Sequence, residues 1–228
     1  MVVVRLLESD FPVVSVLVSD RREAALARRV PEQVPLLVMP QKLAEQVVGY
    51  NFHTGVLACG IRRPGPELSD VAASSGPLLL VACDAVSDPE NVGSIIRLCA
   101  GFGAHGLILG PGCSDAFSRR VLRVSMGTAL RLPIVESNDL ARDLSTLSDD
   151  FGVETLATTL DPAAQPLSAV QRLPRLALVF GKEKHGLGRD VVESCRRRIT
   201  IAMHPGADSL NVAVAAGIFL HHFAQTVE

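Results

Sequence analysis

The sequence has few of the features that mark a membrane, secreted or metal-binding protein. No apolar run approaches the roughly 18 residues that suggest a membrane helix, and the opening valine run stops at Arg5. The five cysteines are an odd number and show no C-x-x-C spacing. Several of them lie within apolar runs, which predicts small buried side chains rather than a disulfide framework or a zinc site. We therefore expect a soluble cytoplasmic protein without a metal.

Lysine is scarce, so nearly all of the positive charge is arginine. The formal net charge is −2, which excludes a polycation, and lysine occurs only at Lys42, Lys182 and Lys184. Arginine forks suit bidentate recognition of phosphate, although a compositional bias gives the same skew. Nucleic-acid binding would therefore depend on local clusters. The candidate clusters are Arg21-Arg22, Arg28-Arg29, Arg62-Arg63, Arg119-Arg120 and Arg123.

A phosphate loop of the form G-x-x-x-x-G-K-[ST] is also missing, and one G-x-G-x-x-G match has the wrong context. Residues 101–106 read GFGAHG, after a predicted helix and before a predicted strand. A dinucleotide site needs these glycines after a strand and at the start of a helix. Glycine just beyond a helix is ordinary C-capping. The pattern therefore favours a helix end over a nicotinamide or flavin oxidoreductase.

What the sequence does contain is enough apolar material for a normal core, in two regions. Hydrophobic residues make up 48% of the chain, which argues against disorder. Residues 62–77 (RRPGPELSDVAASSGP) are rich in Pro, Gly and Ser and predict a linker between a domain at 1–61 and a domain at 78–228. The first region predicts a small α/β module, with strands at 13–18, 35–39 and 55–59 and helices at 23–29 and 41–48.

The second region alternates strands and helices regularly. Short apolar runs of this kind are typical of parallel strands that are buried on both faces. The predicted strands are 78–83, 106–109, 132–135, 153–157, 176–180 and 199–203, and the predicted helices are 90–102, 114–126, 138–145, 187–195 and 210–224. This order predicts a doubly wound α/β domain.

Residues 84–97 (DAVSDPENVGSIIR) carry the first chemical motif. Asp88-Pro89 is a good N-cap and first helical position. Val92, Ile95, Ile96 and Cys99 form an apolar stripe that predicts a core-facing side. Gly93 and Arg97 share another face, so that the glycine leaves space above the guanidinium. A surface arginine on an amphipathic helix is the plain structural alternative.

Two further motifs follow predicted strands. Residues 180–188 (FGKEKHGLG) pass from a strand through Gly181 to Glu183, at the edge where open α/β sheets bind ligands. A solvated turn would give the same letters. Residues 199–215 (ITIAMHPGADSLNVAVA) lead to Ser209, the expected N-cap, and to Asn211 in the first helical turn. Simple capping accounts equally for Ser209.

Together, N-x-G-x-x-x-R, G-x-E-x-x-G-L and S-L-N-V-x-V-A resemble the three motifs of the SpoU (TrmH) family, in the SPOUT superfamily of RNA methyltransferases. The resemblance covers about residue 78 to the C-terminus, and RVSMGTALRLP at 123–133 supports it. Residues 52–58 (FHTGVLA) and the pattern of the first region resemble the small substrate-binding domain that precedes the catalytic domain in many members that modify ribosomal RNA.

The resemblance implies a parallel-sheet SPOUT domain with a deep trefoil knot, an exception to the rule against threading. It implies an S-adenosylmethionine-dependent RNA 2′-O-ribose methyltransferase that acts as a homodimer. Cofactor binding would fall to Thr158, Gly181, Ile201, Met203 and Leu210. Arg97 would be catalytic, with Asn91, Glu183, Ser209 and Asn211 positioning it and the substrate. Because guanidinium stays protonated, we expect Arg97 to act electrostatically and leave the proton acceptor unassigned.

Two departures from the family pattern affect these expectations. Ala202 replaces the proline of the usual I-P-M strand, and His204-Pro205 precedes Gly206, so the loop near the cofactor can differ in shape. The opening MVVVRLLESDFP resembles the tail of the small domain's first helix, which suggests a truncated or shortened start. A non-catalytic RNA-binding module and a tRNA substrate remain alternatives, with ribosomal RNA favoured by the N-terminal module.

Overall fold

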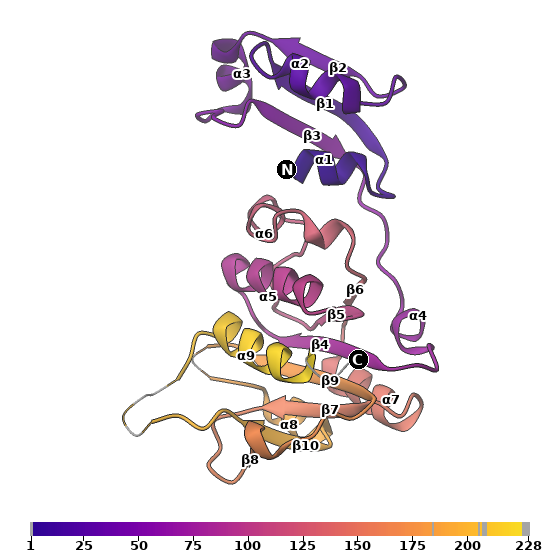
Figure 1. The fold of residues 1–228 in the computed structure, drawn as a ribbon, viewed down its shortest axis with the longest axis vertical. Coiled ribbons are helices and arrows are strands. Elements are labelled where there is room, and N and C mark those ends of the chain that lie inside the picture. Colours follow the sequence, from indigo (N-terminus) through magenta and orange to yellow (C-terminus); the bar gives the residue numbers. More distant parts are fainter. Residues whose placement is uncertain (1, 184, 205, 207–208, 225–228) are drawn as a thin grey trace. The chain divides into compact units, whose positions relative to one another are not determined.

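The computed structural model describes residues 2–183, 185–204, 206 and 209–224. The chain divides into two compact units, Met1–Pro64 and Gly65–Glu228 (Figure 1). Sequence analysis predicts a linker at 62–77, but most of that segment belongs to the second unit. Each unit has its own sheet.

The first unit is a three-stranded mixed sheet with short helices. The strand order is β2-β1-β3, with β1 and β2 parallel and β1 and β3 antiparallel. Val16, Val18 and Leu26 form its small buried core. The elements are α1 (Val2–Leu7), β1 (Val13–Ser19), α2 (Glu23–Leu26), η1 (Ala27–Arg29), β2 (Leu36–Met39), α3 (Gln41–Val48) and β3 (Val56–Gly60). The strands and helices predicted for this region are therefore present.

The second unit contains a seven-stranded sheet in the order β6-β5-β4-β9-β7-β10-β8. Every strand pair in this sheet is parallel, which confirms the predicted parallel α/β sheet. Its strands are β4 (Leu78–Asp84), β5 (Gly106–Leu109), β6 (Ile134–Glu136), β7 (Glu154–Thr158), β8 (Gln165–Pro166), β9 (Arg175–Gly181) and β10 (Arg197–Thr200). Its helices are α4 (Leu68–Ala72), α5 (Pro89–Gly101), α6 (Arg119–Val124), η2 (Thr128–Leu130), α7 (Leu140–Asp149), η3 (Leu167–Ala169), α8 (Arg189–Ser194) and α9 (Val212–Ala224).

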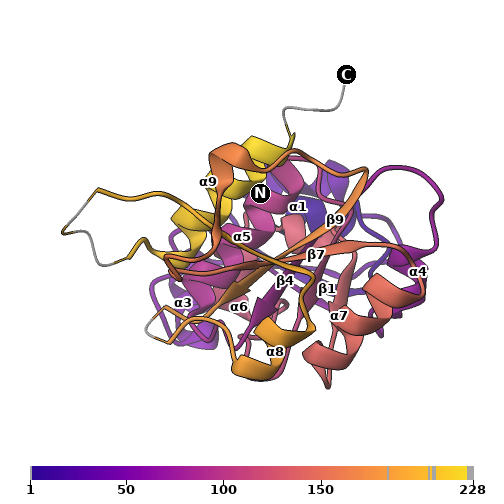
Figure 2. The ribbon, with the colours of Figure 1, turned by 90° about the horizontal axis from the view of Figure 1, so that it is seen from below.

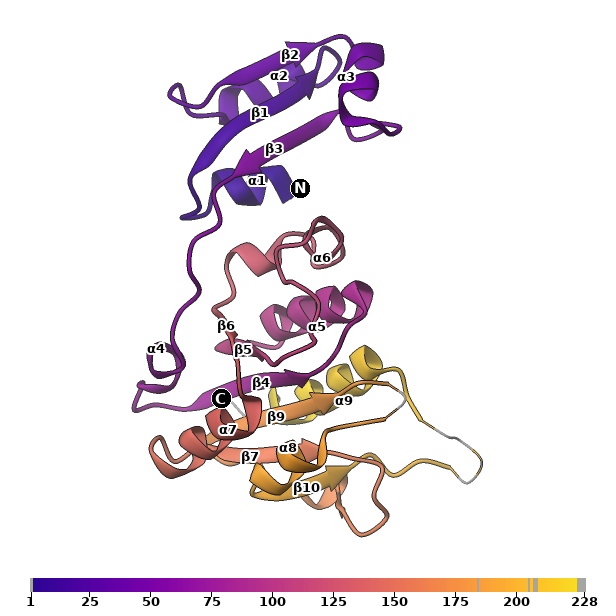
Figure 3. The same cartoon turned by 180° about the vertical axis from the view of Figure 1, so that it is seen from behind.

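Helices cover both faces of this sheet, so two cores form. Leu79, Val81 and Cys83 of β4 pack in the core that contains α5 and α9, while Leu78, Leu80 and Ala82 pack in the core that contains α7 and Val191 of α8. Figure 2 shows α7 and α8 on one side of the strands and α9 on the other, and Figure 3 shows α7 and α8 from their own side. Burial on both faces explains why the strands are continuous apolar runs.

Helix α5 forms as its sequence predicts. Asp88 caps it by accepting a hydrogen bond from the Glu90 backbone N–H at 2.8 Å, with Pro89 in the first turn. All four residues of the predicted apolar stripe are fully buried, namely Val92, Ile95, Ile96 and Cys99. The helix ends at Gly101, where Ala104 N donates to Cys99 O at 2.8 Å and Gly103 has φ of +71°. The GFGAHG pattern is therefore a helix C-cap, as predicted.

The segment predicted as a linker is anchored to the second unit. Helix α4 carries a capping box between Glu67 and Asp70, and Ala72 is buried in the core below it. The Arg175 guanidinium donates to the main-chain oxygens of Ser74, Gly76 and Ala72, which satisfies the end of α4. The Pro, Gly and Ser content of residues 62–77 predicts an irregular linker. The contact that orders this segment comes from Arg175, about 100 residues later in the sequence, so the local composition does not reveal it.

Several predicted element ends are wrong by a few residues. The helix predicted at 114–126 is confined to Arg119–Val124, because Asp115 Oδ1 accepts from Phe117 N at 2.9 Å in a preceding turn and Ser118 caps the helix. The strand predicted at 199–203 is Arg197–Thr200, which pairs with β7 as far as Thr158. Residues 201–204 therefore lie beyond the carboxyl end of β10. Ile201 and Met203, which were predicted to bind the cofactor, thus belong to the loop after the strand and not to the strand itself.

The described residues contain neither a membrane-spanning helix nor a cluster of metal ligands. No helix among them is both long and apolar enough to cross a membrane. No group of three or more His, Cys, Asp or Glu side chains within the described ranges is arranged to hold a metal ion.

Candidate functional site at the carboxyl ends of the strands

The three sequence motifs meet where the order of the strands reverses. β4 pairs with β5 on one side and with β9 on the other, and Asp84 lies opposite Gly181 in the register. β7 ends nearby at Thr158, and β10 ends at Thr200. The carboxyl edge at such a switch point is where open α/β sheets bind ligands, because the loops diverge there and expose main-chain groups.

Asn91, Glu183 and Asn211 form one hydrogen-bonded cluster. Asn91 Nδ2 and Asn211 Nδ2 each donate to Glu183 Oε1 at 2.8 Å. Asn211 Nδ2 also lies 3.0 Å from Asn91 Oδ1. Asn91 is buried, with 6% exposure, whereas Glu183 and Asn211 are exposed. Three residues separated by up to 120 positions thus lie together, one from each motif.

The cap of α9 differs from the prediction. Sequence analysis predicts Ser209 as the N-cap, but α9 begins at Val212 and Asn211 Oδ1 accepts from Ala213 N at 2.9 Å and Val214 N at 3.2 Å. Asn211 is therefore the cap residue itself. Its amide oxygen binds the helix end while its amide nitrogen binds Glu183, so the helix fixes the orientation of the cluster.

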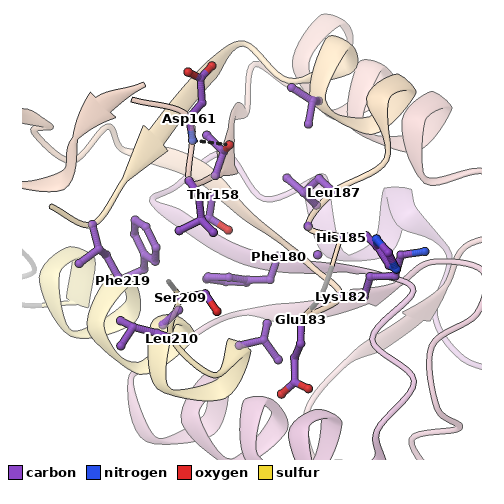
Figure 4. Close-up of a pocket in the computed structure, with 18 of the residues that line it drawn as sticks. Thr158, Asp161, Phe180, Lys182, Glu183, His185, Leu187, Ser209, Leu210 and Phe219 are labelled. Carbon is purple, nitrogen blue, oxygen red and sulfur yellow. Dashed lines mark hydrogen bonds between the residues drawn. The ribbon is translucent and has the colours of Figure 1, made fainter. Parts of the chain in front are cut away.

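A cavity of about 340 Å³ lies beside this cluster (Figure 4). Apolar side chains such as Phe180, Leu187 and Phe219 line it, together with the polar residues Thr158, Asp161, Glu183 and Ser209. Figure 4 shows Asp161 and Glu183 on opposite sides of Phe180. A mostly apolar cavity with a few polar groups is typical of a small-molecule site.

Gly181 lines this cavity at a point where two main-chain segments lie in close contact. A Cβ atom at this position would collide with the main chain of Gly186 and Leu187. The loop is closed by a bridge between Lys182 and Gly186, whose N–H donates to Lys182 O at 2.9 Å, and Gly186 has φ of +65°. Gly188 N donates to Asp84 Oδ2 at 2.7 Å, which ties the loop to the end of β4. The predicted glycine turn thus exists because two main-chain segments lie in contact.

The predicted cofactor-binding residues all line the cavity, namely Thr158, Gly181, Ile201, Met203 and Leu210. Two of the predicted catalytic residues, Glu183 and Ser209, line it as well. Asn91 and Asn211 contact Glu183 just outside the cavity. Thr158 Oγ1 donates to Val179 O at 2.8 Å, so its hydroxyl also joins β7 to β9. The ligand that these residues bind stays a prediction.

Arg97 is not brought into this cluster. It is exposed on α5, away from the buried stripe, and is not among the cavity-lining residues. The predicted role of Gly93 is wrong. A Cβ at Gly93 would lie 2.7 Å from Val124 Cβ, so this glycine allows α6 to pack against α5 and does not clear space for Arg97. The role of Arg97 therefore stays a prediction.

Sequence reasoning missed several lining residues. Leu160 and Asp161 follow β7, and Phe219 projects from the second turn of α9. Asp161 Oδ2 lies 3.6 Å from Arg198 Nη1, so this carboxylate has a cationic partner. Only the strand order places the end of β7 beside the end of β9, and that order is not written in the local pattern. A buried phenylalanine in an apolar helix gives no separate signal.

Burial makes four of the five thiols poor nucleophiles. Burial raises the pKa of Cys99 to about 12 and that of Cys195 to about 12, and it also raises the pKa of Cys83 and Cys113. The raised values keep these groups as neutral thiols throughout the neutral range, and only the thiolate is reactive. Cys59, by contrast, is exposed.

We therefore expect one fast-reacting thiol in the native protein. Titration with a disulfide reagent at pH 7.5 should modify Cys59 within seconds, while Cys83 and Cys99 react only after denaturation. Peptide mapping of the modified protein checks the assignment, with Cys59→Ser as the matched control that abolishes the fast phase. Fast labelling of Cys99 in the folded protein would contradict the burial described above.

Comparisons with known proteins match both units. Residues 78–221 match the SpoU rRNA Methylase family. An uncharacterized tRNA/rRNA methyltransferase of Mycobacterium bovis is 35% identical over 223 residues, which cover 96% of this chain and 76% of that protein. The AdoMet-bound rRNA methyltransferase of Sinorhizobium meliloti has a similar structure, with a TM-score of 0.85, 25% identity, and coverage of 100% of this chain and 85% of that one.

A shorter structure matches less of the chain. The TrmH/SpoU tRNA modifying enzyme of A. aeolicus gives a TM-score of 0.58 at 24% identity, and the match covers 69% of this chain and 81% of that one. The family match includes all three motifs, the cavity and the cluster of Asn91, Glu183 and Asn211. The chain therefore belongs to the SpoU rRNA methylase family, whose members are RNA methyltransferases.

Proposed function

We propose that this protein transfers the methyl group of S-adenosylmethionine to a ribose 2′-hydroxyl of ribosomal RNA. The observation that carries the proposal is the meeting of Asn91, Glu183 and Asn211 at the rim of a largely apolar cavity. The cavity suits a small cofactor, and the polar cluster suits a substrate hydroxyl beside it. S-adenosylmethionine, when bound, supplies an electrophilic methyl group on a positively charged sulfur.

The lining residues fit this cofactor. Phe180, Phe219 and Leu187 offer apolar surface for an adenine ring. Main-chain groups of Gly181 at the end of β9, of Ile201 just after β10 and of Leu210 just before α9 can offer hydrogen bonds, and the missing side chain of Gly181 allows close approach. Thr158 and Met203 complete the predicted set.

The polar groups at the rim favour a hydroxyl as methyl acceptor. None of the described cavity-lining residues is a cysteine, so a covalent thiolate mechanism has no nucleophile in this part of the chain. Amide and carboxylate groups from Asn91, Asn211 and Glu183 can orient a hydroxyl and accept its hydrogen bond. Ser209 lines the same cavity and can assist. We assign Arg97 the stabilisation of the developing negative charge on the attacking oxygen.

The two-unit architecture favours ribosomal RNA over tRNA. The rRNA methyltransferase of Sinorhizobium meliloti covers this whole chain, whereas the tRNA modifying enzyme of A. aeolicus covers 69% of it. We propose that the first unit, residues 1–64, binds RNA through its arginine pairs, with phosphate contacts that weaken as salt is added. Arg21-Arg22 and Arg28-Arg29 belong to this unit.

The test is methyl transfer from labelled S-adenosylmethionine to total bacterial RNA in which the target nucleotide is not yet methylated. We expect label in ribosomal RNA, at a single nucleotide that resists alkaline cleavage because its 2′-oxygen is methylated. Label in tRNA alone would move the substrate to the alternative class. Cofactor binding without transfer to any RNA would favour a non-catalytic RNA-binding module.

We also propose a homodimer. Val214 and Ile218 lie one turn apart on α9 and are 53% and 39% exposed, an apolar strip beside the cluster. Pairing through α9 would cover this strip. Sedimentation at micromolar concentration should give twice the 24.2 kDa chain mass, and Val214→Glu with Ile218→Glu should give the single-chain mass. A wild-type protein that sediments only as a single chain would contradict the proposal.

A further inference from the structure

The two oxygens of the Glu183 carboxylate have different surroundings. Oε1 accepts hydrogen bonds from the side-chain amides of Asn91 and Asn211, each at 2.8 Å. Among the described residues, Oε2 accepts none. A carboxylate offers about four lone-pair sites, so one oxygen of Glu183 is held in place while the other can accept a hydrogen bond or a proton.

The residues that hold Oε1 are themselves fixed. Asn91 is buried in the first turn of α5, and Asn211 caps α9 through Ala213 N at 2.9 Å. Two helices therefore orient the carboxylate. The positive end of α9 is also a favourable electrostatic environment for a negative charge. Such preorganisation is what an acceptor group needs in order to act without rearrangement.

The other titratable groups on the cavity wall are less suited to accept a proton from the rim. Asp161 lies across the cavity from Glu183, beside Arg198. His185 lines the cavity from the loop after β9, where Figure 4 shows it next to Lys182, and neither Asn91 nor Asn211 hydrogen-bonds to it. Arg97 is exposed on α5 and does not line the cavity. Of the titratable groups among the described lining residues, Glu183 is the one that accepts hydrogen bonds from both asparagines.

We propose that Glu183 is the proton acceptor of methyl transfer, an assignment that rests on the proposed function. The 2′-hydroxyl proton passes to Oε2 as the 2′-oxygen forms its bond to the methyl carbon. The carbon–sulfur bond breaks, and its electron pair stays on sulfur, which becomes neutral. Because Glu183 is exposed at the rim, the resulting carboxylic acid returns its proton to water and is ready for another turnover.

Glu183→Gln tests this role with little change of shape. The amide oxygen of glutamine can still accept from Asn91 and Asn211, but the group no longer takes up a proton. We expect the single-turnover rate to fall about 10²–10⁴-fold, the usual contribution of a general base. Cofactor affinity from calorimetry and RNA affinity from gel shift should stay within about twofold, because the hydrogen bonds at Oε1 remain.

Three further variants make the result specific. Glu183→Asp keeps a carboxylate and should recover part of the rate that Glu183→Gln loses. His185→Gln changes the neighbouring imidazole and should lose far less of the rate than Glu183→Gln, whereas Glu193→Gln, which changes an exposed carboxylate on α8 that pairs with Arg189, should keep the wild-type rate. If His185→Gln instead abolishes turnover while Glu183→Gln does not, the histidine is the acceptor and the proposal is overturned.

The remaining outcomes separate this assignment from the proposed function. Label on the ribose with an undiminished rate in Glu183→Gln overturns the proton-acceptor role alone. A loss of cofactor affinity in Glu183→Gln that matches its loss of rate assigns Glu183 to cofactor binding and also overturns the role. Label on a base, or no label on RNA from the wild-type protein, overturns the proposed function and this role with it.

Discussion

Arg97→Ala is expected to lower the single-turnover methylation rate by about 10²–10³-fold, the effect of losing one preorganised electrostatic donor. The apolar stripe of α5 is fully buried without Arg97, and Arg97 itself is exposed, so packing gives no reason for the arginine. Thermal stability and cofactor affinity should therefore hardly change, because the side chain belongs neither to the core nor to the cavity wall. The measurement uses saturating RNA and cofactor.

Two comparisons sharpen this result. Arg97→Lys should stay strongly impaired, because an ammonium group cannot reproduce a planar fork of donors. Arg142→Ala removes an exposed arginine from α7, on the other face of the sheet, and should leave the rate unchanged. A wild-type rate in Arg97→Ala would make this residue an ordinary surface arginine, and an unfolded variant would show that it is structural.

Gly181→Ala should weaken S-adenosylmethionine binding roughly 10- to 100-fold. The added Cβ would collide with the main chain of Gly186 and Leu187, which cannot move without opening the Lys182–Gly186 bridge. Overpacking of this kind costs about 1–3 kcal/mol, which corresponds to that loss of affinity if the loop carries the strain. Calorimetry with the cofactor measures the effect.

The matched control is Gly101→Ala at the end of α5. A Cβ there meets nothing within 4 Å, so cofactor affinity and melting temperature should stay at wild-type values. The same exchange is thus made at one position without space for a Cβ and at one position with space for it. Unchanged affinity in Gly181→Ala would place the cofactor elsewhere. A large drop in melting temperature would show that the loop supports the whole unit rather than the cavity alone.

The helices and strands of this fold can be predicted from local sequence patterns, whereas the order in which the strands pair cannot. Continuous apolar runs predict the strands because both faces are buried, and Asp88-Pro89 predicts the start of α5. The insertion of β9 between β4 and β7 depends on pairings across almost 100 residues. No window of sequence contains that information, so Leu160, Asp161 and Phe219 were not predicted at the cavity.

The three motifs correctly predicted where the site lies, but the roles of individual residues within it were predicted less well. Asn91, Glu183 and Asn211 form one hydrogen-bonded cluster, although the sequence around each residue does not indicate that the three lie together. By contrast, Ser209 and Asn211 are equally good cap residues in sequence, and the structure gives the cap to Asn211. Gly93 could serve Arg97 or α6, and only the position of Val124 decides between them.

The central position of β9 has a consequence for synthesis on the ribosome. The side of β4 that pairs with β9 has no partner strand until residues 175–181 have been synthesised, more than 90 residues after β4 itself. At about 5–20 residues per second the nascent chain exposes that apolar edge for roughly 5–20 s. An uncovered strand edge is a template for wrong pairing. Newly made chains should therefore depend on chaperones far more than the finished protein does.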